Sequence, residues 1–270
     1  MEISICTGVF GPESREASGF ERAAGMAAVA GYRLVEPSGS HLRLPNSHSA
    51  LAAAGLEVWA VHGSFGCVEP GAISESADER RHTLDRELEL LHMAAAYAPC
   101  PYVIHYLSRH NDPAVAERWC NSVQELLVHA AALQLTLAVE TVPFKPEVNE
   151  RYADTAEVAA FVRAFDSEYL RVCVDVNHAN LHEDLGQAIC NCSGQISDIH
   201  ISDNHGLREE HLQPGEGVID MPFALAALRE AGYSGPCNLE CYVPGGLTVE
   251  SLSALRVAAE ELVAESMSVL

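Results

Sequence analysis

Short apolar stretches alternate with longer helical patterns eight times along this chain, and this alternation most constrains its fold. The predicted strands are residues 3–9, 32–35, 58–61, 102–104, 136–139, 170–174, a seventh run that begins at Ile196, and 237–239. The predicted helices are residues 17–30, 47–54, 78–98, 112–133, 154–165, 184–190, 220–231 and 248–265. Because these connections are too long for hairpins, the strands are expected to run parallel. Eight such units predict an α/β fold, a closed (β/α)8 or TIM barrel.

Length and composition fit one barrel domain over residues 1–270. No apolar run reaches the roughly 18 residues of a membrane span, so no membrane association is expected. The first residues, MEISICTGVF, carry neither a basic leader nor a cleavage site. The 9 cysteines are scattered, which in a domain of this size favours reduced thiols. The sequence therefore predicts a cytoplasmic protein.

The charge balance is strongly acidic, with 16 basic and 38 acidic residues and a formal net charge of −22. Lys145 is the one lysine, so the remaining basic residues are arginines. Proteins bind nucleic acid mainly by neutralising phosphate charge, and an acidic surface repels phosphate. We therefore expect no nucleic acid partner.

Six potential metal ligands each end a different predicted strand, from the third to the eighth. They are His62, His105, Glu140, Asp175, His200 and Glu240. In a barrel these strand ends converge on one mouth, and side-chain alternation points Glu140 and Glu240 towards its axis. Carboxylates that converge repel one another unless a cation or a proton lies between them. Mixed imidazole and carboxylate ligands suit Zn²⁺, Mn²⁺, Fe²⁺ or Co²⁺ better than Ca²⁺ or Mg²⁺.

The seventh strand leads into the stretch ISDIHISDNHGLREEHLQPGEG, which is dense in histidines and carboxylates. Ile199 and Ile201 are expected on one face of the strand, with Asp198, His200 and Ser202 on the other. The loop beyond carries further candidate ligands and ends in glycines. These residues are Asp203, His205, Glu209, His211, Pro214, Gly215 and Gly217. By itself this loop is equally consistent with a metal site and with a solvated polar loop.

Several other polar residues have open roles. Glu36 ends the second predicted strand and is either a substrate contact or a hydrogen-bond acceptor at the barrel end. His41 is expected in a loop or on the surface. Candidate substrate contacts for a phosphate, a carboxylate or hydroxyl groups are His205, Arg208 and Lys145, with Tyr242 as a further possibility.

The motifs VHGSF, VIHYL, AVETV, VDVNHAN, DIHISDN, HLQPGEGVID and NLECY follow one another in this order. In that order they resemble the xylose-isomerase-like barrel superfamily, which contains sugar isomerases and epimerases and the endonuclease-IV branch of DNA-repair enzymes. The resemblance runs from the third strand to the eighth, and more loosely over the whole chain. Its most specific part is the GEG-x-ID segment, followed by a helix, Gly-Tyr and a strand that ends in Glu240.

In the isomerases, the resemblance implies one divalent ion, zinc or manganese, held by Glu140, Asp175, His200 and Glu240. It also implies that this ion binds adjacent oxygens of the substrate. Glu140 and Glu240 would then exchange a proton at the carbon next to the carbonyl.

The endonuclease-IV branch instead implies three zinc ions. Its additional ligand types fall on His62 and His105, which share Glu140, and on His178, Glu209 and His211. Glu209 departs from the pattern, because the branch has aspartate there. The segments that handle DNA in that branch are harder to find here, since the fifth strand continues as ETVPFKPE rather than as a glycine-rich run and the first strand lacks the branch's usual motif.

The sequence thus predicts a metal-dependent sugar or polyol isomerase or epimerase of carbohydrate metabolism, with Glu140 and Glu240 as its catalytic residues. The alternative is a multinuclear-zinc phosphoesterase of endonuclease-IV type. A non-catalytic sugar-binding barrel is a weaker alternative, because both acid–base glutamates are present. The expected partner is a small sugar or polyol, and a homo-oligomer stays open.

Overall fold

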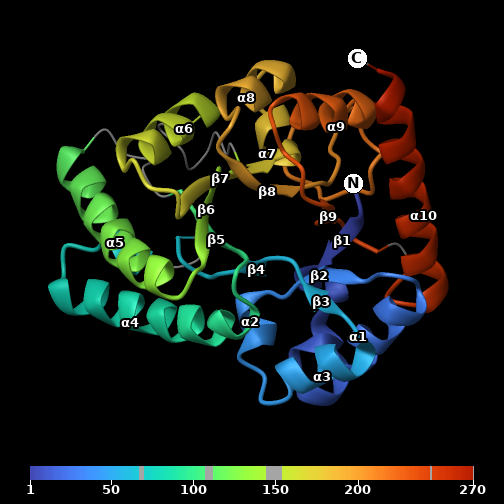
Figure 1. Cartoon of the computed structure of the whole chain (residues 1–270), viewed down its shortest axis with the longest axis horizontal. Helices are drawn as coiled ribbons and strands as arrows, with labels where there is room; N and C mark the ends of the chain where they lie inside the picture. Colours follow the sequence, from blue (N-terminus) through green and yellow to red (C-terminus); the bar gives the residue numbers. More distant parts are fainter. Residues whose placement is uncertain (67–69, 107–111, 144–153, 244, 270) are drawn as a thin grey trace.

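The computed structural model describes residues 1–66, 70–106, 112–143, 154–243 and 245–269. Its strands are β1 Ile3–Cys6, β2 Leu34–Glu36, β3 Glu57–Val58, β4 Val61–His62, β5 Pro101–His105, β6 Thr136–Glu140, β7 Leu170–Asp175, β8 Ile196–His200 and β9 Cys237–Leu239. Its α-helices are α1 Ala17–Val29, α2 Gly39–Leu42, α3 Ser47–Ala54, α4 Ala77–Ala94, α5 Pro113–Ala132, α6 Thr155–Ala164, α7 Val176–Asn180, α8 Leu185–Asn191, α9 Met221–Glu230 and α10 Val249–Glu265. The helices surround the strands (Figure 1).

The strands form a closed parallel barrel. Hydrogen-bonded ladders run in the orders β3-β2-β1-β9 and β4-β5-β6-β7-β8, and every strand pair is parallel. Isolated parallel bridges, Ser38 to His62 and Ile201 to Leu239, join the two ladders. Since β3 and β4 together form the third strand, the barrel has the eight strand positions that the sequence predicted. The TIM-barrel prediction is confirmed.

Two predicted strands differ in detail. The third was expected to be continuous, but the structure divides it into β3 and β4 on either side of Trp59 and Ala60. The first was expected to reach Val9, but β1 ends at Cys6 and a 3-10 helix, Thr7–Phe10, follows. The side chain of Thr7 explains this early end, because its Oγ1 accepts a hydrogen bond from the Ser38 N–H at 3.0 Å and lies 2.8 Å from Nδ1 of His41.

The helices begin largely where the sequence predicted them. Asp112, Asp154, Asp184 and Asp220 each accept a backbone N–H at a helix start, and Thr248 does the same for α10. The predicted helix 78–98 is shorter, because α4 ends at Ala94 and a 3-10 turn, Ala95–Tyr97, follows it. The short helices α2 and α7 were not predicted. No helix in the described parts of the chain is long and apolar enough to cross a bilayer.

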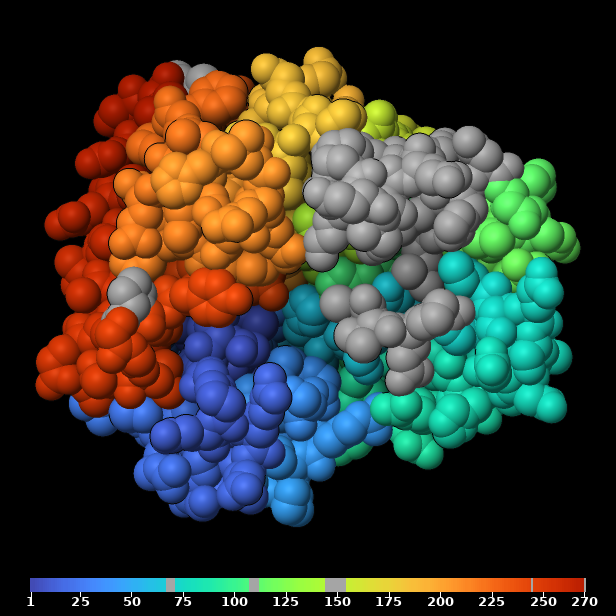
Figure 2. Space-filling model, turned by 180° about the vertical axis from the view of Figure 1, so that it is seen from behind, coloured from blue at the N-terminus to red at the C-terminus, as the bar shows by residue number. Residues whose placement is uncertain are grey.

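The alternation of side chains across the strands is as predicted. Leu137 and Val139 belong to the large apolar core between the barrel and the helices. Val103, Ala138 and Cys173 form a separate small cluster inside the barrel. Beyond this cluster the inward positions become polar towards the strand ends. On the surface, the segment that follows β8, orange in Figure 2, lies on the same face as the blue N-terminal residues.

Candidate metal centre

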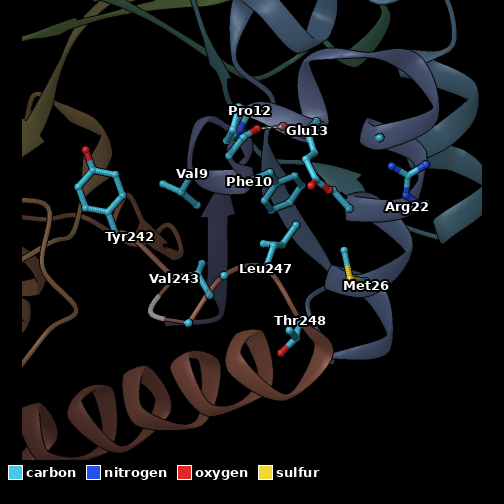
Figure 3. Close-up of a pocket in the computed structure, with 16 residues that line it drawn as sticks. Val9, Phe10, Pro12, Glu13, Arg22, Met26, Tyr242, Val243, Leu247 and Thr248 are labelled. Carbon is cyan, nitrogen blue, oxygen red and sulfur yellow. Dashed lines mark hydrogen bonds between the residues drawn. The ribbon is translucent and has the colours of Figure 1, made fainter.

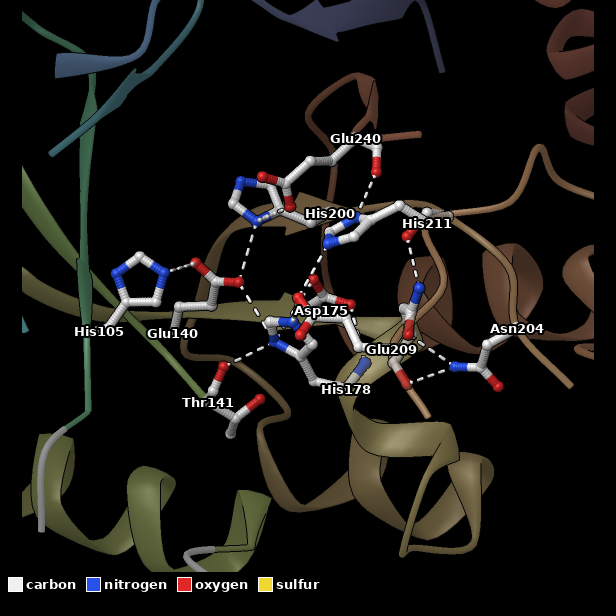
Figure 4. A network of polar contacts seen from close by, with 12 residues as sticks. His105, Glu140, Thr141, Asp175, His178, His200, Asn204, Glu209, His211 and Glu240 are labelled. Atoms are coloured by element: carbon white, nitrogen blue, oxygen red, sulfur yellow. Dashed lines mark hydrogen bonds and ion pairs between the residues drawn. The ribbon is translucent and has the colours of Figure 1, made fainter. Parts of the chain in front are cut away.

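Four side chains from separate strands converge at the mouth of the barrel (Figure 4). The ladders pair His105 with Glu140 and Asp175 with His200, so these inward residues lie at matching levels. His200 Nδ1 is 3.2 Å from Glu140 Oε1 and 3.2 Å from Glu240 Oε2. One potential ligand atom from each of these residues lies within 4.8 Å of the others in the set Glu140, Asp175, His200 and Glu240. The structure brings together the four ligands that the resemblance implied.

Several potential ligand atoms of this group lack the hydrogen bonds that buried polar atoms normally make. Among the described residues, both carboxylate oxygens of Glu140, Oδ2 of Asp175 and Nδ1 of His200 are buried without a hydrogen-bond partner. Leaving such atoms unsatisfied costs about 1–3 kcal/mol each. A divalent cation satisfies all of them at once, and the mixture of oxygen and imidazole nitrogen suits zinc or manganese. The residues therefore fit the implied metal.

Burial and charge act on the three carboxyl groups in opposite directions. Burial raises the pKa of Asp175 and of Glu240 above the usual range of these groups. Burial also acts to raise the pKa of Glu140, but the neighbouring His200 and His105 outweigh it and hold this pKa well below its usual range. Burial thus favours the neutral form of Asp175 and Glu240, whereas the neighbouring histidines keep Glu140 ionised.

A second group of ligands adjoins the first through Glu140. His105 Nε2 is 3.3 Å and His62 Nε2 is 3.6 Å from Glu140 Oε2. Potential ligand atoms of these three residues also lie within 4.8 Å of one another. Nδ1 of His62 is 3.1 Å from the carbonyl oxygen of Gly63, which can only accept. Nδ1 therefore carries a hydrogen, which leaves Nε2 as the nitrogen that faces the carboxylate and that would bind a metal once it is deprotonated.

A third group gathers around Glu209 in the loop after β8. Its Oε1 is 2.8 Å from His211 Nε2 and 3.3 Å from His178 Nε2. Nδ1 of His178 donates to the carbonyl of Thr141, and Nδ1 of His211 donates to that of Glu240, each at 2.8 Å. The two Nε2 atoms therefore face the same carboxylate oxygen. This trio is not among the groups of described residues whose ligand atoms all lie within 4.8 Å of one another.

Protonated histidines can balance the negative charge of these carboxylates in place of a metal ion. Burial acts to lower the pKa of His178, but Asp175 and Glu209 outweigh it and raise that pKa to about 10. In the same way Glu140 and Glu240 outweigh the burial of His62 and raise its pKa to about 9. A metal that binds Nε2 of either ring displaces such a proton, so binding is expected to weaken as the pH falls.

Asp203 holds the loop that carries Glu209 and His211. It is fully buried, and its Oδ2 accepts the backbone N–H groups of Gly215 and Gly217, each at 2.9 Å. Its Oδ1 accepts those of Asn204 and Ile219 at 2.9 and 3.1 Å. A side chain at Gly217 would place its Cβ 2.3 Å from the carbonyl oxygen of Asn204. The GEG motif therefore serves this close packing.

Two of the predicted substrate contacts are exposed residues in the segment after β8. His205 and Arg208 have side chains that are 54% and 79% exposed, and both approach Glu210, at 2.9 and 3.5 Å. Lys145 lies outside the described residues. Their assignment to substrate binding stays a prediction.

Two polar residues, one whose role the sequence left open and one expected in a loop or on the surface, are buried. Glu36 is fully buried and lies 3.2 Å from His200 Nε2, so its contacts favour the acceptor role over the substrate contact. His41, expected in a loop or on the surface, is buried instead, and that expectation was wrong. Its ring lies against Phe20 at 4.8 Å and meets the hydroxyl groups of Thr7 and Ser14. The serines at positions 38 and 40, next to His41, were the sequence signal that this histidine has hydrogen-bond partners.

A cavity of about 530 Å³ lies beside the mouth, between the segments that follow β1 and β9 and next to α1 (Figure 3). Its lining is mainly apolar and includes Val9, Phe10 and Tyr242. The ring of Tyr242 is 5.9 Å from that of His211, so the cavity reaches the edge of the third ligand group.

The chain belongs to the xylose isomerase-like TIM barrel family, whose model matches residues 22–270. The predicted resemblance is confirmed. An uncharacterized protein of Methanocaldococcus jannaschii is 25% identical over 195 residues, which are 67% of this chain and 63% of that protein. The L-ribulose-5-phosphate 3-epimerase of Escherichia coli is 22% identical over 142 residues, 52% of this chain and 48% of the enzyme.

A solved structure of D-psicose 3-epimerase with D-tagatose, from Clostridium cellulolyticum, has a TM-score of 0.77 to this chain. The two are 19% identical, and the alignment covers 99% of each. At this identity the likeness establishes the fold and leaves the activity to the residues of the site.

Proposed function

We propose that the protein is a metal-dependent epimerase or isomerase of a small sugar or polyol. The observation that carries this proposal is the convergence of Glu140, Asp175, His200 and Glu240, with buried donor atoms that lack partners among the described residues. The names of the relatives support the same reaction class, because they include a ribulose-phosphate 3-epimerase and a psicose 3-epimerase.

A zinc or manganese ion held by these four residues would polarise a substrate carbonyl and stabilise negative charge on its oxygen. Glu140 and Glu240 supply the acid–base pair. One carboxylate removes the proton from the carbon next to the carbonyl, and the other carboxyl group returns a proton to that carbon. The two side chains come from β6 and from the end of β9, with β7 and β8 between them. They therefore approach the mouth from different sides, as inversion at one carbon requires.

The test is exchange of a substrate proton with solvent. Candidate ketoses and their phosphates, incubated with the metal-loaded protein in deuterated buffer, should incorporate deuterium at the reacting carbon without hydrolysis. Glu140→Gln and Glu240→Gln should each lower this rate by about 10²- to 10⁴-fold. Glu125→Gln, a half-exposed glutamate on α5, is the matched control and should leave the rate unchanged.

Sugar binding by the metal-loaded protein without deuterium incorporation would instead support the non-catalytic barrel. If neither glutamate variant loses activity, the assignment of Glu140 and Glu240 as the acid–base pair is refuted.

A second candidate, a multinuclear-zinc phosphoesterase, rests on a separate observation. The groups around His62 and around Glu209 adjoin the first ligand set, and Glu140 is shared. Three tightly bound zinc ions together with cleavage of a generic phosphodiester would favour this candidate. Since the net charge is −22, we expect neither activity to involve nucleic acid.

A further inference from the structure

Glu36 faces Nε2 of His200, the ring nitrogen opposite to the one that faces Glu140 and Glu240, and potential ligand atoms of Glu36, His62 and His200 also lie within 4.8 Å of one another. It ends β2, and its side chain is fully buried. Nε2 of His200 is 3.2 Å from its Oε1 and is hydrogen-bonded to its Oε2 at 3.3 Å, whereas Nδ1 of the same ring faces Glu140 and Glu240. The imidazole ring of His200 therefore lies between the carboxylate of Glu36 on one edge and those of Glu140 and Glu240 on the other.

The surroundings of Glu36 hold its carboxylate in one orientation. Oε2 of Glu36 accepts a hydrogen bond from Nδ2 of Asn238 at 2.8 Å, and Asn238 is also fully buried. Asp198, two residues before His200 on β8, accepts from Nε1 of Trp59 at 2.9 Å. A carboxylate buried this deeply is costly unless nearby donors satisfy it. His200 and Asn238 are those donors.

A neutral imidazole has one N–H donor and one lone pair, and the partner of one nitrogen decides which role the other has. A carboxylate that accepts from Nε2–H leaves the lone pair on Nδ1. That nitrogen lies 3.2 Å from the oxygens of Glu140 and Glu240. A carboxylate behind the ring also makes Nδ1 a stronger electron donor.

We propose that Glu36 is a positioning residue, which fixes His200 with Nε2–H donated to its carboxylate and with Nδ1 as the ligand of the metal. This inference rests on the metal site of the proposed function and adds to it a buried residue from the opposite wall of the barrel. In this role Glu36 acts on the metal through His200.

Glu36→Gln tests the inference because it removes the negative charge that favours a hydrogen on Nε2 of His200. Nδ2 of Asn238 needs an acceptor, so the amide oxygen should take the place of Oε2, where a neutral amide accepts from Nε2 less strongly than a carboxylate does. The amide NH₂ takes the place of Oε1, 3.2 Å from Nε2, and competes for a lone pair there. Nδ1 is then no longer held free of a hydrogen. Loss of such a partner typically weakens metal binding by about 10- to 100-fold.

The experiment measures zinc affinity by competition with a chromophoric chelator for the full chain and its variants. Glu36→Gln should bind zinc about 10- to 100-fold more weakly than the wild type. Glu87→Gln is the matched control, since Glu87 is also buried but accepts from Tyr102 and Ser64. It should keep the wild-type affinity. Equal affinities of the wild type and both variants would overturn the inference.

Nitrogen NMR of the zinc-loaded wild type, labelled with ¹⁵N-histidine, gives an independent readout if a variant fails to fold. We expect zinc at Nδ1 of His200 and a hydrogen at Nε2. Zinc at Nε2 would overturn the role of Glu36 while leaving the metal site intact. A wild type that binds no zinc or manganese would instead refute the metal site itself, and with it this inference.

Discussion

The carboxylate of Asp203 is the strongest single restraint on the loop that carries Glu209 and His211, and Asp203→Asn tests this restraint. The substitution keeps the shape of the side chain but leaves one acceptor oxygen for four N–H donors, two of which then face an NH₂ group. A hydrogen bond to a charged group contributes about 1.5–3 kcal/mol. Gly215 is exposed, so water can satisfy its N–H. We therefore expect the free energy of unfolding to fall by about 3 kcal/mol rather than by twice that value.

Hydrogen exchange followed by mass spectrometry locates the effect. Peptides from residues 203–219 should exchange markedly faster in Asp203→Asn, while peptides from β5 and β6 change only as far as global stability does. Leu207→Ala is the control, because Leu207 lies in the same loop but is 87% exposed. Unchanged exchange of residues 203–219 in Asp203→Asn would refute the reasoning.

Two further predictions concern local packing. Alanine at Gly217 places a Cβ 2.3 Å from backbone of Asn204, so Gly217→Ala should accelerate exchange of the same loop and lower the melting temperature; a variant as stable as the wild type would contradict this. Burial lowers the pKa of His41 from 6.5 to about 4, so protonation favours the unfolded chain as the pH falls from 6.5 towards 4. Relative to His41→Gln, the wild type should lose about 2 kcal/mol between pH 7.5 and 5 in urea unfolding, and parallel pH profiles would exclude the effect.

The barrel and the convergence of its strand-end residues could be predicted because both depend on local patterns, whereas the choice of four of them as metal ligands came from the family resemblance. Alternation along β6 places Ala138 and Glu140 on the inner side, and neighbouring strands repeat the pattern. Once the strands are parallel, geometry brings their ends together. Neither step needs knowledge of which distant residues meet.

The supporting contacts could not be predicted, because no pattern in the sequence identifies the partners of these buried polar side chains. Glu36 and His200 are 164 residues apart, and nothing near Glu36 in sequence identifies its partner. His41 belongs to a polar loop segment and is buried only because Phe20 of α1 covers its ring. Asp203 is one of several polar residues in its segment, and the sequence does not show that its carboxylate accepts four backbone N–H groups.

Glu140 also decides between the two candidate chemistries. Its Oε1 faces His200 and its Oε2 faces His62 and His105, so ions in both groups would occupy both of its oxygens. A carboxylate used in this way is no longer free to take a proton from carbon.

We therefore expect deuterium incorporation to rise with the first equivalent of zinc and to fall as further zinc binds. His105→Gln removes a ligand of the second group but none of the first, so it should keep the activity at one equivalent and lose the inhibition by excess zinc. Glu125→Gln, on the surface of α5, should remain inhibited like the wild type. Activity that instead rises steadily up to three equivalents, or a His105→Gln variant that is still inhibited, would show that Glu140 does not couple the two groups.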